Sequence, residues 1–142
     1  MIFKELLTGQ HRFAAAEKHQ AFKFRVLNYF LIIAVVFGFL IGALGYVGVM
    51  QIGQITPIAD FVFALSSGFL AWYLRQDKRN FQRVAQLFVF STYTLFVIAL
   101  LTVATDEARI AWFYITVYIA YMLLGARFGV FYTLLSVTSI AV

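Results

Sequence analysis

The feature that most constrains this chain is a stretch of 25 residues, 26–50, without a single charged side chain. As a helix rising about 1.5 Å per residue it is about 38 Å long, enough to cross a hydrocarbon core about 30 Å thick. Further apolar stretches follow, separated by short polar links. The pattern predicts an all-α, polytopic transmembrane helical bundle, with spans at 26–50, 57–74, 84–104, 110–126 and 128–142.

Composition supports a lipid environment. Of the 142 residues, 63% are hydrophobic and 12% are charged, whereas soluble domains have about 45–50% apolar and about 25% charged residues. The net charge of +5 could suit nucleic acid, but the basic residues cluster at the ends of apolar stretches, so we expect no nucleic-acid partner. The chain has no cysteine, which excludes disulfides, cysteine-ligated metal centres and a thiol nucleophile.

Lysines and arginines predict the orientation. Segment 1–25 carries five of them, loop 75–83 carries four, and Arg127 lies in a turn predicted at 125–129, while only Arg109 lies on the other side. Basic residues favour the cytoplasmic side. We therefore expect a multi-pass protein of the bacterial inner membrane with a cytoplasmic N-terminus and external loops at 51–56 and 105–109.

The two ends of the chain lead to two further expectations. Segment 1–25 is polar with an apolar stripe that starts at Phe3, Leu6 and Leu7, which predicts a short amphipathic helix on the cytoplasmic face. The last apolar stretch, 130–142, rises only about 20 Å as a helix. We therefore expect the chain to be truncated at its C-terminal end, within a parent protein of six spans.

Glycines recur along one side of the first span, at spacings of four, three and three residues. Such a row lets another helix approach closely. The partner is either another helix of the same chain or the same helix of a second copy, and the spacing does not decide between them. The candidates for helix packing or dimerisation are Gly38, Gly42, Gly45 and Gly48.

Asp60 is the one ionisable residue inside a predicted span. Pro57 suits the first turn of a helix, which places Asp60 in that same turn. The acid is then either a favourable partner of the helix dipole or a ligand contact in a pocket that opens outward.

The external side offers further candidates for ligand binding. The loop 105–109 is either a solvated turn or part of a ligand site. In the helix that follows, Tyr114, Tyr118 and Tyr121 share one face, here called the tyrosine face. It serves either packing and an aromatic belt or a pocket for a small apolar ligand. Beside Asp60, the candidates are Asp106, Glu107, Arg109, Trp112, Tyr114, Tyr118 and Tyr121.

Nothing in the sequence indicates catalysis. His11 and His19 are eight residues apart, which does not suit a helical metal-binding pair. We predict no catalytic residue, no metal site and no cofactor in this chain. A transporter would need a polar path through the bundle, for which the chain offers only Ser66, Ser67, Ser91, Thr92 and Thr94.

The run DEARIAWFYITVYIAYMLLGARFGVFYTLLSV at 106–137 resembles the N-terminal membrane region of bacterial diguanylate cyclases. Residues 25–46, RVLNYFLIIAVVFGFLIGALGY, are similar to the first span of such regions, and RQDKRNFQRVAQLF at 75–88 to their second cytoplasmic turn. Related modules also precede histidine kinases. The resemblance implies a parent protein with a cytoplasmic domain that joins two GTP molecules into cyclic di-GMP, with Mg²⁺, as a dimer. It assigns no catalytic residue to this chain.

The sequence therefore predicts a sensory and dimerisation input module of a signal-transduction protein. It would lie in the lipid bilayer as a homodimer and respond to a small-molecule signal through a change in helix packing. A small membrane transporter or a transporter subunit is one alternative, and a structural membrane scaffold is another.

Overall fold

The computed structural model describes residues 18–50, 55–102 and 109–141. These residues form five α-helices and one short 3₁₀-helix, and no strand occurs among them. The elements are α2 (Lys18–Tyr46), α3 (Ile55–Gln76), η2 (Lys78–Asn80), α4 (Phe81–Thr102), α5 (Arg109–Leu124) and α6 (Ala126–Ala141). The predicted all-α fold is confirmed for this part of the chain. Most of the predicted amphipathic segment lies outside it, and residues 18–25 are the beginning of α2.

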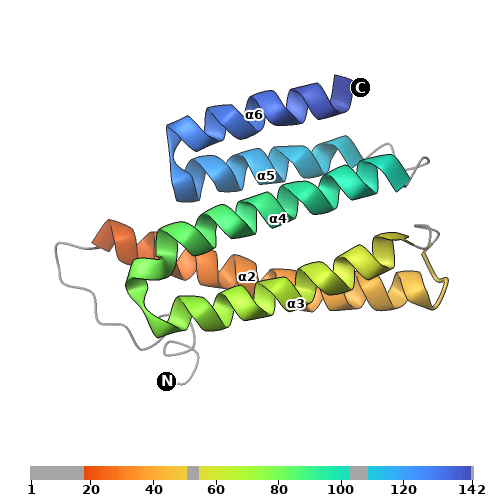
Figure 1. Ribbon diagram of the computed structural model, residues 1–142, viewed down its shortest axis with the longest axis horizontal. Helices are drawn as coiled ribbons and strands as arrows, with labels where there is room; N and C mark the ends of the chain where they lie inside the picture. Colours follow the sequence, from red (N-terminus) through yellow and green to blue (C-terminus); the bar gives the residue numbers. More distant parts are fainter. Residues whose placement is uncertain (1–17, 51–54, 103–108, 142) are drawn as a thin grey trace.

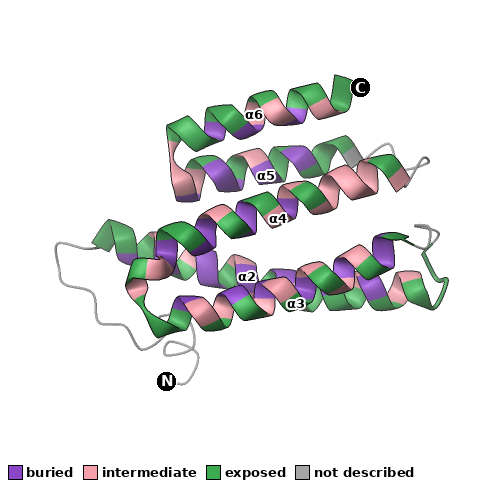
Figure 2. Cartoon of the chain, in the orientation of Figure 1, coloured by how far each residue is buried: buried purple, intermediate pink, exposed green. Residues whose placement is uncertain are grey.

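Two helix pairs flank α4. Figure 1 shows α2 beside α3 on one side of α4, and α5 and α6 stacked on the other side. Each helix buries a stripe along the face that meets its neighbours, while α6 at the edge stays largely exposed (Figure 2). Apolar side chains on outward faces suit a helix that meets lipid there.

The apolar core lies where α2, α3, α4 and α5 come together. It combines mainly the first half of α2, the second half of α3, the first half of α4 and the second half of α5, and Tyr132 of α6 joins it. Its fully buried members include Leu27, Leu31, Leu74, Val84, Ala85, Val89 and Ala120. Because these segments all lie toward one end of the bundle, that half is the more tightly packed.

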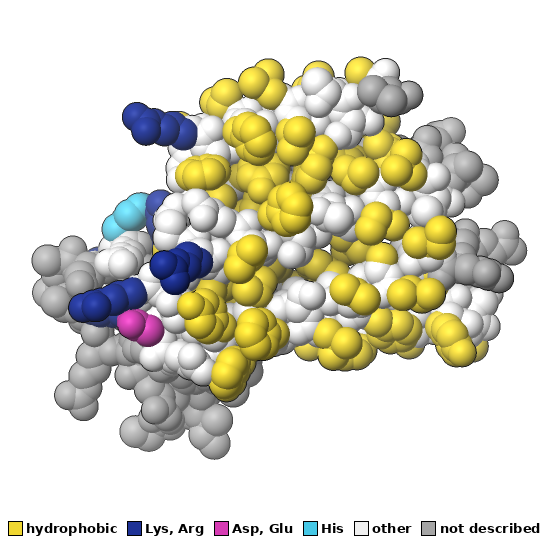
Figure 3. Space-filling model, in the orientation of Figure 1, with side chains coloured by type: hydrophobic (Ala, Val, Ile, Leu, Met, Phe, Trp, Pro, Cys, Tyr) yellow, Lys and Arg dark blue, Asp and Glu magenta, His cyan; other side chains and the backbone are white. Residues whose placement is uncertain are grey.

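Most described basic residues gather at this same end, here called the basic end. α2 begins there, α3 ends there, α4 begins there, and α5 turns into α6 there (Figure 1). Its lysines and arginines stand apart from the apolar surface of the helices (Figure 3). They are Lys18, Lys23, Arg25, Arg75, Lys78, Arg79, Arg83 and Arg127.

Two glycines set helix ends that differ from the predicted ones. α2 ends at Tyr46 and not at residue 50, because Gly48 takes a left-handed conformation (φ +80°). The backbone N–H of Val49 donates to the carbonyl of Leu44, and that of Gly48 to Gly45, the pattern of a Schellman cap. Gly125 (φ +89°) alone separates α5 from α6, so the five-residue turn predicted at 125–129 is wrong.

Three helices are long and apolar enough to cross a membrane: α2, α3 and the stretch from η2 through α4. α5 and α6 are apolar but shorter, with 16 residues each. At about 1.5 Å per residue each is about 24 Å long. The predicted number of five spans therefore stays a prediction.

Candidate functional site

Gly38 and Gly42 form the closest contact between α2 and α3, here called the α2–α3 seam. A Cβ atom added at Gly38 would lie 3.0 Å from the Cβ of Ala64 and 3.0 Å from the backbone oxygen of Asp60. At Gly42 it would lie 3.2 Å from the backbone oxygen of Pro57. Both glycines therefore pack on a helix of the same chain, with room for little more than hydrogen.

The other two glycines of the predicted row lie elsewhere. Gly45 lies in the last turn of α2 and is partly exposed, and Gly48 lies beyond the helix end. A cap residue in the left-handed conformation cannot continue the helical face of Gly38 and Gly42. Dimerisation through the glycine row remains a prediction.

The backbone of Asp60 contacts Gly38 at the seam, and its side chain is buried. α3 begins at Ile55, two residues before the predicted start, so Asp60 is in the second turn and not the first. The residue is 5% exposed, and its Oδ2 atom has no hydrogen-bond partner among the described residues. An ionised carboxyl group that is buried without a partner lowers the free energy of unfolding by several kcal/mol. A buried acid inside a membrane helix is therefore a candidate for ligand binding.

Small and polar residues continue the stripe of Asp60 along α3. Ala64 and Ser67 follow it at spacings of four and seven residues, and both are buried. The Ser67 hydroxyl also lacks a hydrogen-bond partner among the described residues. α3 thus carries two buried polar groups, the Asp60 Oδ2 atom and the Ser67 hydroxyl, about 10 Å apart along the helix, and neither has a hydrogen-bond partner among the described residues.

Thr56 links the seam to α4, a role that the sequence analysis did not predict. Its hydroxyl is 2.8 Å from the hydroxyl of Thr102, and Thr102 also donates to the carbonyl of Ile98 in its own helix. Thr56 lies one turn before Asp60, so both point to the same side of α3. The spacing of Thr56 and Asp60 indicates this position from the sequence alone. Its partner on α4, Thr102, could not be predicted, because it lies 46 residues away.

The external candidates are only partly described. Asp106 and Glu107 lie outside the described residues, and Arg109 is the first residue of α5. Trp112 is exposed, with its ring centroid 5.6 Å from that of Phe96 on α4. A ligand site formed by the external loop stays a prediction.

The tyrosine face points away from the core. Tyr114 is 73% exposed, Tyr118 63% and Tyr121 42%. The buried side of α5 instead carries Phe113, Thr116, Ile119, Ala120 and Leu123. The three tyrosines are thus exposed in the described chain, and a ligand pocket on this face stays a prediction. Tyr114 and Tyr118 point outward from the bundle, while the Tyr121 ring lies against Gly129 of α6.

The polar residues considered for a transport path do not come together. Ser66, Ser91 and Thr94 line a groove of about 180 Å³ between α3 and α4. Ser67 is instead buried on α3, and the Thr92 hydroxyl donates to the carbonyl of Phe88 in its own helix. These five residues therefore do not line one continuous path.

The described part of the chain holds no cluster of residues that could bind a metal ion. Within it, no three residues among His, Cys, Asp and Glu lie close enough to hold a metal ion. His19 is exposed near the start of α2, and His11 lies outside the described residues. The arrangement offers a helix seam with a buried carboxyl group, which suits a change in packing better than a reaction.

Comparison with known proteins gives one match. The model of the MASE6 family matches residues 16–142, which is most of the chain. No curated protein and no solved structure matches significantly. The match agrees with the three helices that are long and apolar enough to cross a membrane. The chain belongs to the MASE6 family and is a membrane sensory module.

Proposed function

We propose that this chain is the membrane-embedded sensory and dimerisation input module of a bacterial diguanylate cyclase. The observation that carries the proposal is the match of the MASE6 family over residues 16–142. The resemblance of residues 25–46, 75–88 and 106–137 to the membrane regions of diguanylate cyclases supports the choice of output. The cyclase domain, with its Mg²⁺ and GTP, would belong to another part of the parent protein.

The basic end is proposed to face the cytoplasm of a bacterium, with the protein in the inner membrane. Eight described lysines and arginines lie there, against Arg109 at the opposite end of α5. Such an asymmetry sets the orientation of multi-pass proteins. In this orientation Gly38, Asp60 and the link between Thr56 and Thr102 lie in the external half of the bundle.

The proposed signal acts on the seam. A ligand that binds Asp60, or that changes the spacing of α2 and α3, favours one packing of the two helices over another. Because Gly38 and Gly42 allow so little space, the seam has few intermediate arrangements, which favours a switch between discrete states.

The packing change is proposed to spread through α4. Thr56 and Thr102 join α3 to α4 at the external end. Nearer the middle of α4, the hydroxyl of Tyr93 is hydrogen-bonded to that of Ser139 on α6, and the Tyr93 ring contacts Tyr132. A shift of α3 is thus passed to α6 by direct contacts. In a homodimer it would change how two output domains meet.

Two measurements test this function. The first is the reading frame beyond Val142, which we expect to encode a cytoplasmic cyclase domain. The second is cyclic di-GMP formed from GTP and Mg²⁺ by membranes that contain the full protein, compared with a chimera in which an unrelated dimeric membrane anchor replaces residues 16–142.

We expect the chimera to form cyclic di-GMP at a basal rate. Unlike the full protein, it should show the same rate in membranes from cells grown under different conditions. An equal response of the two proteins would contradict the sensory role. A reading frame without any signalling domain, together with solute flux in reconstituted vesicles, would support a transporter instead.

A further inference from the structure

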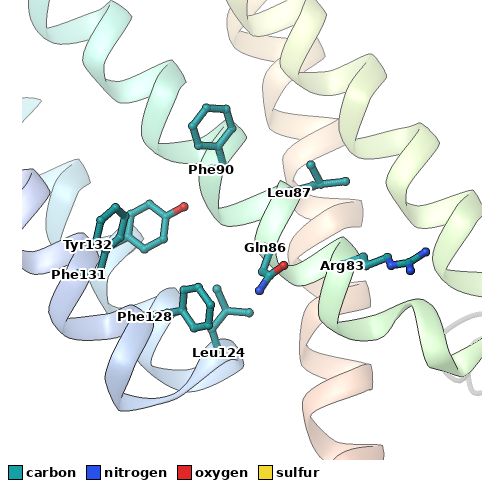
Figure 4. A pocket seen from close by; sticks show the side chains of 8 residues that line it. All are labelled: Arg83, Gln86, Leu87, Phe90, Leu124, Phe128, Phe131 and Tyr132. Atoms are coloured by element: carbon teal, nitrogen blue, oxygen red, sulfur yellow. The ribbon is translucent and has the colours of Figure 1, made fainter.

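A groove opens between α4 and the α5–α6 pair at the basic end. Its volume is about 500 Å³, within the usual range of small-molecule sites. α4 contributes Arg83, Gln86, Leu87 and Phe90 to the lining, and α6 contributes Phe128 and Phe131. Figure 4 shows Phe128, Phe131, Tyr132 and Leu124 on one side of the groove and Phe90 and Gln86 facing them from α4, with Leu87 and Arg83 farther around α4 and the Arg83 guanidinium pointing away from the phenylalanines.

The polarity of the side chains that line the groove changes along its α4 wall. Arg83 and Gln86 lie in the first two turns of α4, whereas Phe90 lies about 10 Å farther along the helix. On the opposite wall, Phe128 is in the first turn of α6 and Phe131 in the next. Along its α4 wall the groove therefore carries a cation at its mouth, the end nearest the turn between α5 and α6, and an aromatic ring farther in, whereas its α6 wall is aromatic throughout. A phospholipid that lies beside the bundle has the same order of headgroup and acyl chain.

The charge of the mouth selects an anionic headgroup. Among the described residues no carboxylate lines the groove, and Asp77 is the one acid at the basic end. Arg127 precedes the lining residue Phe128 and adds a second cation in that turn of α6. Basic pockets between helices on this side of a membrane bind anionic lipid headgroups.

We propose that this groove binds one anionic glycerophospholipid. The phosphate lies at Arg83 and Gln86, and an acyl chain lies along Leu87, Phe90, Phe128 and Phe131. The lipid would contact α4 and α6 together and so hold the α5–α6 pair against α4. The proposal depends on a membrane location but not on the cyclase output.

The test is lipid association measured by electron spin resonance. The full chain is reconstituted in phosphatidylcholine vesicles that contain either spin-labelled phosphatidylglycerol or spin-labelled phosphatidylcholine. We expect a preference for phosphatidylglycerol. Arg83→Gln lowers the association constant of that lipid about fivefold, since one basic residue near an anionic surface contributes about that factor.

Arg79→Gln is the matched control, because it removes one exposed charge from the basic end outside the groove. We expect it to change the association constant less than twofold. Leu87→Trp keeps every charge but fills the groove, so it should also lower phosphatidylglycerol association. Circular dichroism of each variant checks that the helices remain folded.

Three results would overturn the proposal. Equal effects of Arg83→Gln and Arg79→Gln would mean general attraction to the basic end. Unchanged association in Leu87→Trp would place the lipid outside the groove. Cross-linking of groove residues between two chains would identify a second copy as the occupant.

Discussion

At the residue scale, Gly38 and Gly68 differ in the space that surrounds them. A Cβ at Gly38 would lie 3.0 Å from the Cβ of Ala64, whereas one at Gly68 would lie 3.7 Å from Cγ2 of Val35, an ordinary contact. Gly38→Ala should therefore push α2 and α3 apart at a cost of about 1–3 kcal/mol. Gly68→Ala should be neutral or stabilise by up to about 1 kcal/mol through helix propensity.

Reversible unfolding in mixed micelles measures the free energy of both variants. Equal effects of the two substitutions would show that the seam is not tightly packed at Gly38.

A second residue-scale prediction concerns Gly129. A Cβ there would overlap the ring of Tyr121, so Gly129→Ala forces the tyrosine ring out of its place against α6. We expect a loss of about 1–3 kcal/mol in the free energy of unfolding. Adding Tyr121→Ala should recover part of it, because the two substitutions act on one contact.

Tyr118→Ala is the control for this rescue. Tyr118 lies on the same helix and is exposed, but it is not among the atoms closest to Gly129. Recovery by both tyrosine variants would argue against the specific contact between Tyr121 and Gly129.

At the element scale, the link between α3 and α4 can be measured by a double-mutant cycle. Thr56→Val and Thr102→Val each remove one hydroxyl of the 2.8 Å pair. Hydrogen bonds between membrane helices contribute about 0.6 kcal/mol on average and at most about 1.7 kcal/mol. We expect a coupling energy in that range. Thr94→Val is the control, since Thr94 donates to the carbonyl of Phe90 within α4, and its coupling with Thr56→Val should be near zero.

The helical elements could be predicted because apolar stretches between polar links need only length and composition. Their ends depend on local geometry that the composition does not show. The left-handed cap at Gly48 shortens α2, and a single left-handed residue, Gly125, suffices to turn α5 into α6.

The candidate site was harder to predict because it depends on contacts between elements. Asp60 could be selected as an unusual residue, but its burial depends on where α3 begins and on which face meets α2. The partner of Gly38 could not be inferred, because a glycine row fits any close helix. The groove at Arg83 was missed because it combines α4 with α6, which are separated in the sequence by α5.

At the scale of the whole molecule, the proposed orientation predicts which end of the bundle a reagent outside the cell can reach. The chain contains no cysteine, so a single added cysteine reports its own side of the membrane. Gln76→Cys lies at the basic end and Met50→Cys at the opposite end, and both positions are exposed. A membrane-impermeant maleimide should label Met50→Cys in intact spheroplasts and Gln76→Cys only after lysis. The reverse pattern would contradict a cytoplasmic basic end.

The central claim is that packing at the α2–α3 seam controls a cytoplasmic output. The most direct test is the rate of cyclic di-GMP formation by membranes that contain equal amounts of the full protein, with Asp60→Asn or Asp77→Asn. Asp60 is the buried acid of the seam, whereas Asp77 is exposed at the basic end. Coupling between sites typically changes an equilibrium about 5- to 150-fold. We predict at least a fivefold change in rate for Asp60→Asn and no change for Asp77→Asn, whereas equal rates for both variants and the unmodified protein would contradict the claim.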